Sequence, residues 1–573
     1  MERFWTKQYD EGVPEDLEIE EKTVVDFLAQ SASRFPNQPA LTLKGKTFTY
    51  RELQDLVDRF ATALSKMGVK EGTRVACWMP NIPQYVIAYY ATLKLGGTVV
   101  QTNPLYMERE FVHLFNDSQA EVVVTCDFLY WYKLRQAMSK VPTVKNVVVT
   151  SIPDYLPFPL NFLAPFKLKK TQQYVKVPRE KNVHFFKELI ASNPPSPPKA
   201  EPKFDEVAVL QYTGGTTGVS KGAMLTHKNI SVNAQQALRW FPKCELGKEV
   251  LLACLPYFHS FGMTVSMNWP ICSGAHIVLA PNPRDIADLV KSITKYRVTL
   301  FPALPALYVA INNFPGIGDV DVSSVKYCFS GSAPLPLEVL ERFEKLTGSL
   351  ITEGFGLSET SPITHANPLY GTRKPGSVGL PVPGTDMKIV DIDTGEKELE
   401  VGEEGELCIK GPQVMKGYLN RDDETAKMIR GDWCYTGDLA KVDEDGFFFI
   451  VGRKKDMIVA GGYNVYPDEI DDVLFAHPDV LEAATIGIPD EKRGETVKSF
   501  VVLHPGKKTT ADEIKAYCKK ELAAYKVPAQ IEFLAELPKS TMMKILRKDL
   551  REIEIAKMKT QPPKGDAQPA ARA

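Results

Sequence analysis

The feature that most constrains this chain is a glycine- and hydroxyl-rich string that follows a short apolar run. The run spans 207–210, and the string at 212–222 reads Tyr-Thr-Gly-Gly-Thr-Thr-Gly-Val-Ser-Lys-Gly. Glycine lets backbone N–H groups approach an anion closely, hydroxyls donate hydrogen bonds to phosphate oxygens, and Lys supplies a positive charge. The string therefore predicts a strand followed by a loop that binds a polyphosphate.

This loop differs from a Walker A loop, which requires Gly-Lys-Ser/Thr in direct succession. Val219 and Ser220 separate Gly218 from Lys221 here. A flexible polar turn without a ligand is the alternative interpretation of a single glycine-rich segment. The candidate phosphate-binding residues are Thr213, Gly214, Gly215, Thr216, Thr217, Gly218 and Lys221.

Length and composition limit the class of protein. A chain of 573 residues is expected to form two to four domains. Its formal net charge of -2 gives no global indication of nucleic-acid binding. The nine cysteines contain no C-x-x-C pair, so neither a zinc site nor a redox pair is indicated. No apolar signal core or spanning run of about 18 residues is present, so we expect a soluble cytoplasmic protein.

Strand and helix patterns alternate in the N-terminal half. Thr49 and Glu52 form a capping box that predicts a helix start, and Gly68 is a plausible C-cap. Further segments are expected as strands at 74–79, 98–102, 121–125 and 146–150 and as a helix at 84–95. This alternation predicts α/β architecture with a mostly parallel sheet in a large N-terminal domain.

The segment Leu156 to Lys170 interrupts the alternation. It is apolar, contains three prolines and ends in a basic stretch. The prolines argue against a regular helix through it. One interpretation is an irregular segment packed on the core. The other is a patch that touches a membrane surface through its apolar part and basic flank.

Two further candidates lie in the middle of the chain. His259 ends an apolar run beside aromatic residues, and Glu359 follows Gly354 and Gly356, which we expect to permit a tight turn. Mg²⁺ in ATP chemistry binds few protein carboxylates and bridges phosphates. Glu359 is therefore a candidate metal-side ligand, with Thr213 and Thr360 near the nucleotide. A structural histidine and a solvated glutamate are the alternatives.

Together the motifs resemble the adenylate-forming (AMP-binding) superfamily, which contains acyl-CoA synthetases, aryl-CoA ligases, peptide-synthetase adenylation domains and firefly luciferase. The resemblance extends from about Thr49 to Lys548 with the motifs in order. The likeness is strongest to bacterial long-chain fatty acid–CoA ligases, in the segments 212–229, 282–285 and 464–467. It implies ATP-dependent activation of a fatty acid through an acyl-adenylate, transfer of the acyl group to CoA, and Mg²⁺ as cofactor.

The resemblance implies roles for individual residues of the large domain. His259 would line the acyl pocket, and the turn with Gly331 and Ser332 would pack against adenine and the acyl chain. Asp438 and Arg453 would hold the ribose. From the residues alone, an aspartate after a glycine is commonly a turn, and the charged run at 452–456 is commonly solvated.

The resemblance also implies the organisation of the C-terminal part, in which helix and strand patterns follow a small β subdomain at 376–418. Lys455 would lie at a hinge, Gly462 would line the channel for the CoA thiol arm, and Lys544 would be the catalytic lysine. Met543 stands where the family usually has glycine. The expected organisation is a large domain at 1–452, a hinge at 453–455, a small mobile α+β lid at 456–559 and a disordered tail at 560–573.

Three alternatives to a long-chain ligase stay open. The acyl group could be medium-chain or aromatic, a luciferase-like oxygenase would share the adenylation step, and a nucleotide-binding relic would keep only the fold. Lys544, Asp438 and Arg453 argue against the relic. The expected partners are a fatty acid, ATP and CoA, without nucleic acid. Monomer and homodimer both stay open, as does peripheral contact with the inner face of the cell membrane.

Overall fold

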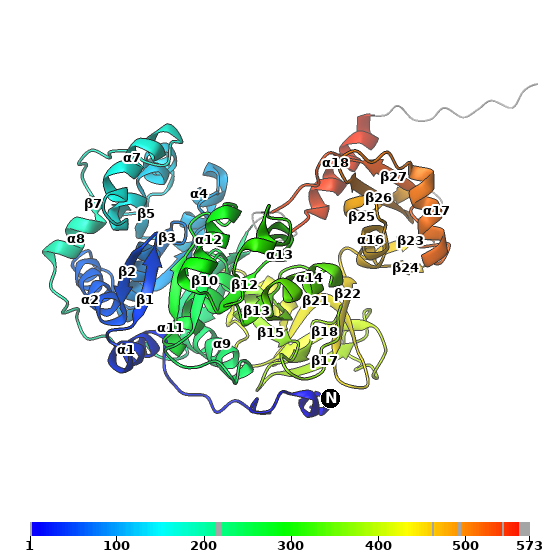
Figure 1. The fold of residues 1–573 in the computed structure, drawn as a ribbon, viewed down its shortest axis with the longest axis horizontal. Helices are drawn as coiled ribbons and strands as arrows, with labels where there is room; N and C mark the ends of the chain where they lie inside the picture. The colour runs from blue at the N-terminus through cyan, green and yellow to red at the C-terminus, as the bar shows by residue number, and fades with distance from the viewer. Residues whose placement is uncertain (1–2, 214–219, 461–462, 491–493, 541–543, 561–573) are drawn as a thin grey trace, which may run out of the picture. The chain divides into compact units, whose positions relative to one another are not determined.

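The computed structural model describes residues 3–213, 220–460, 463–490, 494–540 and 544–560, and Figure 1 shows its fold. The internal contacts divide the chain into two units, which are described separately. Unit 1 comprises Met1–Lys388, Cys408–Thr436 and Val442–Phe449, and unit 2 comprises Ile389–Leu407, Gly437–Lys441 and Ile450–Ala573.

One sheet of unit 1 has nine strands, and its middle is parallel. Its strands, in spatial order, are β16 (Leu380–Pro381), β15 (Ile363–Ala366), β14 (Leu350–Gly356), β13 (Tyr327–Ser330), β12 (Leu300–Ala303), β10 (Val250–Ala253), β11 (His276–Leu279), β1 (Pro39–Leu43) and β2 (Lys46–Thr49). Neighbours from β14 to β1 are parallel. The outer strands β15, β16 and β2 pair antiparallel.

A second sheet of unit 1 has eight strands. In spatial order these are β19 (Gly417–Tyr418), β9 (Lys221–Thr226), β8 (Val207–Thr213), β4 (Thr98–Gln101), β3 (Arg74–Trp78), β5 (Val122–Cys126), β6 (Asn146–Thr150) and β7 (Val183–Phe185). Strands β8 to β7 pair in parallel, whereas β9 and β19 add an antiparallel edge. The prediction of mostly parallel α/β sheets is therefore confirmed.

Helices cover and separate these two sheets. The longer α-helices of unit 1 are α1 (Val24–Arg34), α2 (Tyr50–Lys66), α3 (Pro83–Lys94), α4 (Glu108–Ser118), α7 (Leu160–Lys170), α8 (Phe186–Ser192), α9 (His227–Trp240), α12 (Ile286–Tyr296), α13 (Pro305–Asn312), α14 (Leu337–Thr347) and α15 (Asp422–Met428). The shorter helices α10 (Ser260–Met263) and α11 (Trp269–Ser273) follow the His259 turn. The short turn η7 spans Ser358–Thr360.

Local sequence signals located most of these elements. The side chains of Thr49 and Glu52 form the predicted capping box of α2, and Gly68 has the positive φ of 92° expected just after a helix. The observed bounds of β3, α3, β4, β5 and β6 closely match those predicted. These segments carry their apolar periodicity and caps locally, so their positions follow from the sequence.

Helix α3 is buried on nearly all sides, because it contacts β3 and β4 of one sheet and β1 of the other. Three tyrosines in it are fully buried, and their hydroxyls find partners. Tyr85 donates to Gln101, Tyr90 donates to the Asn268 carbonyl oxygen Oδ1 at 3.0 Å, and Asn268 Nδ2 donates to Tyr89 at 3.1 Å. A helix that is apolar all round is expected in such a buried position.

Helices α12, α13 and α14 pack against one face of the nine-stranded sheet (Figure 1). The hydrophobic core between them and strands β10, β12 and β13 holds them there. Phe301 of β12 packs against Tyr308 of α13 and Phe343 of α14, with ring centroids 5.6 and 6.0 Å away. Burial of such aromatic side chains stabilises the sheet by about 2 kcal/mol each. This core holds the strand ends that carry the candidate residues.

The segment 156–170 differs from its prediction. Residues Leu160–Lys170 form helix α7 with Pro165 inside it, so the prediction of an irregular segment is wrong. Proline removes one hydrogen bond, the one its own N–H would donate, and the short helix tolerates that loss. None of the α7 residues is buried, so the segment is not packed on the core. Across the described residues, no helix is both long and apolar enough to cross a membrane.

Unit 2 contains an α+β fold, as predicted. Its sheet has the strands β24 (Tyr463–Val465), β23 (Ile458–Ala460), β26 (Gly494–Leu503) and β25 (Val480–Asp490) in that order, and β27 (Gln530–Phe533) pairs with β26. Its helices are α16 (Pro467–Phe475), α17 (Ala511–Glu521) and α18 (Arg547–Thr560). The capping box of Thr510 and Glu513 starts α17, as predicted.

Alternate residues of β25 and β26 face two separate cores. Val497 and Val501 join the core with α16 and α17, whereas Phe500 and Val502 join the core with α18. This alternation follows from the two-residue period of a strand.

A further sheet comprises β17 (Asp386–Val390), β18 (Gly405–Lys410), β20 (Ile429–Arg430), β21 (Trp433–Val442) and β22 (Phe448–Arg453).

Three histidines of unit 1 have a lowered pKa because their side chains are removed from solvent. Burial lowers the pKa of His227 and of His276 to about 4 and that of His365 to about 3. His365 lies in β15 between the rings of Phe355 and Phe448. Burial disfavours the charged imidazolium, so these side chains are neutral in the folded protein at neutral pH.

We expect His365 to make the protein less stable in acid. Its folded pKa is below the unfolded value of about 6.5, so stability is present in full above that value and is lost as pH falls toward 3. His365→Gln should reduce the slope of the unfolding free energy against pH by about 1.4 kcal/mol per pH unit between roughly pH 5.5 and 4.5. Urea unfolding at several pH values measures this slope. Equal slopes for both proteins in that range would contradict the expectation.

Candidate active site

The candidate residues of unit 1 follow the carboxyl ends of parallel strands. Strands β10, β12, β13 and β14 run parallel, so their carboxyl ends share one edge of the sheet. His259 lies in the turn after β10, Gly331 directly after β13, and Glu359 in η7 after β14. Ligands of open α/β sheets bind at this edge.

Hydrogen bonds tie these turns to each other and to the strand before the phosphate string. Gln211 of β8 donates from Nε2 to the Phe258 carbonyl at 3.0 Å. The hydroxyls of Ser260 and Ser358 lie 3.2 Å apart, and Thr264 donates to the Ser361 carbonyl at 2.5 Å. The His259 turn is therefore held between β8 and the Glu359 turn.

Glu359 is a buried carboxylate with a defined partner. Tyr418 of β19 donates its hydroxyl to Glu359 Oε1 at 2.7 Å, and the backbone N–H of Met415 donates to the Glu359 carbonyl at 2.8 Å. Burial and then the Glu359 charge raise the pKa of Tyr418 far above its usual range. Tyr418 therefore stays protonated and acts as a fixed donor to the carboxylate.

Glu359 fits the requirements of Mg²⁺. The second carboxylate oxygen accepts no hydrogen bond from any described residue. Mg²⁺ takes hard oxygen ligands and usually one or two carboxylates, and substrate phosphates and water complete its shell. Thr213 is half-buried at the end of β8 and offers a hydroxyl oxygen. Within the described ranges there is no cluster of three or more His, Cys, Asp or Glu that could hold a metal by itself.

Lys221 begins β9, at the far end of the phosphate string, and has an acidic partner. Its ammonium lies 2.5 Å from Glu424 Oε2 of α15 and 5.1 Å from the centroid of the Tyr418 ring. The hydrogen bond from Lys221, and then that from Lys427, lowers the pKa of Glu424. Lysine carries three N–H donors, so the ion pair orients Lys221 and leaves donors for a second anion.

His259 caps the short helix α10. The backbone N–H of Phe261 donates to His259 Nδ1 at 3.2 Å, so Nδ1 acts as an acceptor. This arrangement corresponds to the neutral imidazole tautomer with its proton on Nε2. The side chain is half-buried beside Phe261. A pocket-lining role for His259 stays a prediction.

Gly354 and Gly356 do not form the tight turn that we expected. Both belong to β14, which pairs antiparallel with β15. A Cβ atom on Gly356 would lie 1.8 Å from the Pro362 carbonyl oxygen, and one on Gly354 would lie 2.3 Å from the Phe329 ring. The glycines are required because a neighbouring strand and ring approach the backbone closely.

The remaining candidates of unit 1 occupy turns. A side chain at Gly331 would fit tightly, because a Cβ atom there would lie 3.3 Å from both Phe261 and the Gly354 carbonyl. Ser332 has a positive φ of 74°. Thr360 is fully buried, and its hydroxyl bonds within its own turn, to the carbonyls of Leu357 and Pro362. A direct contact of Thr360 with nucleotide stays a prediction.

Unit 2 holds Asp438 and Arg453 together. Asp438 is buried, and Arg453 Nε lies 2.8 Å from its Oδ1. Glu406 accepts from the N–H of Gly437 at 3.1 Å and from Lys454 Nζ at 3.0 Å, which fixes the Asp438 turn against the segment 453–455. Burial raises the pKa of Asp438, and the charges of Arg453, Lys544 and Lys455 oppose that rise.

The lysines of unit 2 differ in their environment. Lys455 is exposed overall, but partial desolvation of its ammonium group, followed by the charge of Arg453, lowers its pKa. Lys544 is exposed, and its backbone N–H donates to Ser540 Oγ at 3.2 Å. The remaining candidates lie outside the described residues: Gly214, Gly215, Thr216, Thr217, Gly218 and Gly462.

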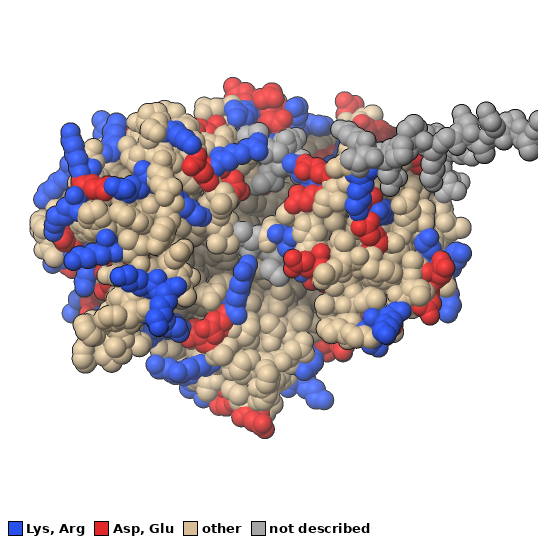
Figure 2. Space-filling view, turned by 90° about the horizontal axis from the view of Figure 1, so that it is seen from above, with Lys and Arg blue, Asp and Glu red and all other residues tan. Residues whose placement is uncertain are grey.

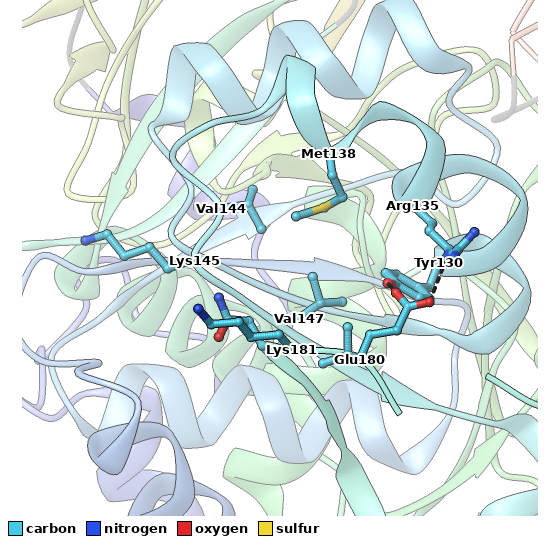
Figure 3. Close-up of a pocket in the computed structure, with 10 residues that line it drawn as sticks. Tyr130, Arg135, Met138, Val144, Lys145, Val147, Glu180 and Lys181 are labelled. Atoms are coloured by element: carbon cyan, nitrogen blue, oxygen red, sulfur yellow. Dashed lines mark hydrogen bonds and ion pairs between the residues drawn. The ribbon is translucent and has the colours of Figure 1, made fainter. Parts of the chain in front are cut away.

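A pocket of about 460 Å³ lies elsewhere in unit 1, beside β6 (Figure 3). Figure 3 shows Tyr130 and Arg135 joined to Glu180, at 2.6 and 2.9 Å. Lys145, also in its lining, pairs with Glu121. Strands β4, β3 and β5 separate β6 from β8, so the pocket is not part of the phosphate string's surroundings.

Comparison with known proteins identifies the family. A family model described as AMP-binding enzyme matches residues 28–419, and one described as AMP-binding enzyme C-terminal domain matches residues 469–544. The chain belongs to the AMP-binding enzyme family. The predicted resemblance is thereby confirmed, and the two family models match the parts of the chain that carry the candidate residues other than Asp438, Arg453, Lys455 and Gly462.

Relatives within the AMP-binding enzyme family match nearly the whole chain. A long-chain-fatty-acid--CoA ligase of Bacillus subtilis (strain 168) is 43% identical over 553 residues, covering 96% of this chain and 98% of that protein. One of Escherichia coli O157:H7 is 40% identical over 557 residues, with the same shares. The anthranilate CoA ligase AuaEII in complex with anthranoyl-AMP superposes with a TM-score of 0.83 at 28% identity, covering 94% of this chain and 99% of that chain.

The structure adds two residues that the sequence motifs did not indicate. Tyr418 and Glu424 contact Glu359 and Lys221, respectively. The only local signal is the acidic run Asp422-Asp423-Glu424 at the start of α15, which is favourable at a helix N-terminus without any ligand. Their partners are distant in sequence, so a local pattern could not have assigned them.

We expect Tyr418 to position Glu359 for the metal. Tyr418→Phe removes the hydroxyl donor and should raise the Mg²⁺ concentration needed for ATP–pyrophosphate exchange by about 10–100-fold, as is usual for partners of metal ligands. Exchange rates across a Mg²⁺ titration measure this shift. Tyr132→Phe, at an exposed tyrosine, serves as the control. A lower rate with an unchanged Mg²⁺ midpoint would contradict the positioning role.

Proposed function

We propose that this protein is a long-chain fatty acid–CoA ligase that forms an acyl-adenylate from a fatty acid and ATP and then transfers the acyl group to CoA. The observation that carries the proposal is the 40–43% identity, over nearly full length, to two curated long-chain-fatty-acid--CoA ligases. The strand-end arrangement of Glu359, Lys221 and His259 supports it, because phosphate and acyl groups bind at such an edge.

In the first step a fatty carboxylate oxygen attacks the α-phosphorus of ATP. The bond to the β-phosphate oxygen breaks, so acyl-AMP and pyrophosphate form. The nucleophile belongs to the substrate, and the protein contributes orientation and charge neutralisation. We assign Lys221 to the phosphates and Lys544 to the attacking carboxylate. Glu359 and Thr213 would hold Mg²⁺, which would supply positive charge to offset that of the phosphates.

Asp438 and Arg453 would bind the ribose. A carboxylate accepts two O–H donors, which suits the ribose diol, and Arg453 already holds one oxygen of Asp438 in place. The carboxylate is buried, so its hydrogen bonds to a ligand would form with little competition from water. This supports a role in orientation rather than in proton transfer.

In the second step the CoA thiol attacks the acyl carbonyl, and AMP leaves. The thiol gives up its proton, and a thioester replaces the mixed anhydride. We propose that Gly462 lines the path of the thiol arm and that residues 453–455 act as a hinge through which Lys544 and Gly462 serve successive steps. The domain limits 1–452 and 456–559 and the tail at 560–573 belong to the same proposal.

The acyl site is proposed to be apolar and deep. The aromatic rings of Phe261, Phe329, Phe241 and Trp269 form a continuous series of contacts behind Gly331 and His259, with centroid separations of 5.7, 6.2 and 4.8 Å. Such side chains suit an alkyl chain. A medium-chain or aromatic acid is the second candidate substrate, because the similar solved structure AuaEII is an anthranilate CoA ligase.

The remaining assignments concern cofactor and location. We propose Mg²⁺ as cofactor and a cytoplasmic location with peripheral contact at the inner face of the cell membrane. Both a monomer and a homodimer agree with this function. A luciferase-like oxygenase and a non-catalytic relic are weaker candidates, because the named relatives with the highest identity are ligases.

Chain length tests the substrate class. Each buried CH₂ group contributes about 0.8 kcal/mol, so kcat/KM should rise by up to about fourfold per CH₂ until the site is filled. A CoA-dependent thioester assay with acids from acetate to stearate, and with benzoate, measures the profile. A maximum at acetate or benzoate would refute the long-chain assignment, and pyrophosphate release that depends on oxygen would favour the oxygenase.

The two half-reactions should separate by mutation. Lys544→Ala removes a charge used while the carboxylate attacks phosphorus, so adenylation should fall by on the order of 10²–10³-fold while thioester formation from supplied acyl-AMP continues. Gly462→Leu should block the thiol path and spare adenylation. Lys508→Ala, at an exposed lysine, is the control. Equal slowing of both steps by Lys544→Ala would contradict the division of roles.

A further inference from the structure

A group of large apolar side chains around α7 faces solvent. The exposed fractions are 84% for Phe158, 42% for Leu160, 65% for Phe162, 52% for Leu163 and 64% for Phe166. No residue of α7 is buried. Apolar side chains are often exposed singly, but a contiguous set on one segment indicates an interaction surface. We call residues Phe158 to Lys170 the α7 surface.

Two of the phenylalanines share one face of α7. Phe162 and Phe166 are four residues apart, the spacing of one helix face, and the exposed Phe158 lies just before the helix. The rings of Phe162 and Phe166 touch, with centroids 5.8 Å apart and edge-to-face geometry. Phe162 and Phe166 therefore present a joint apolar wedge, with the exposed Phe158 two residues before the helix.

The charges along this stretch of the chain have one sign. Between Asp154 and Glu180 the chain carries five basic side chains and no acidic one: Lys167, Lys169, Lys170, Lys176 and Arg179. Within the described part of the chain, Lys167, Lys169 and Lys170 form no ion pair. Figure 2 views the molecule from the side on which α7 lies in Figure 1, and Lys and Arg are frequent at the end that carries α7.

The size of α7 limits the mode of contact. Its 11 residues give a length of about 16 Å, whereas the hydrocarbon core of a bilayer is about 30 Å thick. The helix cannot span a bilayer. A short apolar wedge with a basic flank fits the interface of one leaflet, where the rings enter the acyl region and the ammonium groups meet anionic headgroups.

A second copy of the chain fits the surface less well. A twofold contact would bring together two copies of the same basic patch, and their like charges would repel. The absence of any acidic side chain between Asp154 and Glu180 leaves nothing within the patch to neutralise them. An anionic lipid surface supplies the charge that a second α7 surface lacks.

We propose that the α7 surface docks this protein on anionic lipid bilayers, with Phe158, Phe162 and Phe166 inserted and Lys167, Lys169 and Lys170 at the headgroups. The proposal rests on the proposed function, because long-chain fatty acids dissolve in bilayers and a docked enzyme meets them there. It goes further by naming the element that makes the contact and the charge of the lipid.

Vesicle co-sedimentation tests the proposal with the full-length protein. Wild type should bind vesicles of phosphatidylcholine with phosphatidylglycerol, and salt should weaken the binding by screening. Phe158→Ser/Phe162→Ser/Phe166→Ser and Lys167→Gln/Lys169→Gln/Lys170→Gln should each lower binding by on the order of 100-fold. Leu246→Ser/Val401→Ser, at two exposed apolar turn positions, is the matched control and should bind like wild type.

Activity with a water-soluble acyl chain distinguishes this proposal from the proposed function. Octanoate adenylation without vesicles should be equal in wild type and both variants, which also shows that they fold. The absence of adenylation with every acid from octanoate to palmitate in all of them would reject the proposed function, whatever the vesicle result. Equal sedimentation of wild type and the phenylalanine variant would overturn the docking proposal. A dimer in sedimentation velocity that the phenylalanine variant abolishes would assign the surface to a second copy instead.

Discussion

Parallel pairing of β10, β12, β13 and β14 is the constraint on which the candidate site of unit 1 depends. Parallel strands end at one edge, so residues far apart in sequence are brought there without any direct attraction between them. His259, Gly331 and Glu359 each follow one of these strands. The hydrogen bond from Gln211 to the Phe258 carbonyl then connects this edge with β8 of the second sheet. Strand order, rather than motif chemistry, makes the residues neighbours.

The close approach of neighbouring groups to the backbone of β14 explains two glycines that the sequence analysis assigned to a turn. Gly354 and Gly356 have the composition of a turn, yet both are strand residues against Phe329 and the Pro362 carbonyl. Because β15 pairs with β14 at this short distance, η7 leaves the strand in a fixed direction. That direction places the Glu359 carboxylate under the Tyr418 hydroxyl. A packing requirement thus positions a polar group.

Local patterns predicted the elements better than their arrangement. The capping box of Thr49 and the β-branched runs of β3, β5 and β6 contain their own signals, and the structure confirms them. The pairings of Tyr418 with Glu359 and of Lys221 with Glu424 join residues 59 and 203 positions apart, which no local pattern encodes. Helix α7 was missed for a different reason, because the hydrogen bond and the steric fit that one proline costs do not by themselves exclude a short helix.

The proposed binding sites for polyphosphate and for ribose differ in how their charged side chains are paired. Lys221 lies against one carboxylate and one aromatic ring, so its position is set before a polyphosphate arrives, and two further N–H donors are available. In unit 2 the buried Asp438 has Arg453 against one oxygen, which offsets the cost of removing the carboxylate from water. Removing Arg453 would take one cation from the buried Asp438 carboxylate, whereas Glu424 is partly exposed and would keep Lys427 as a partner. Arg453 therefore both orients the ligand and stabilises the fold, and substitutions at it are expected to affect both properties.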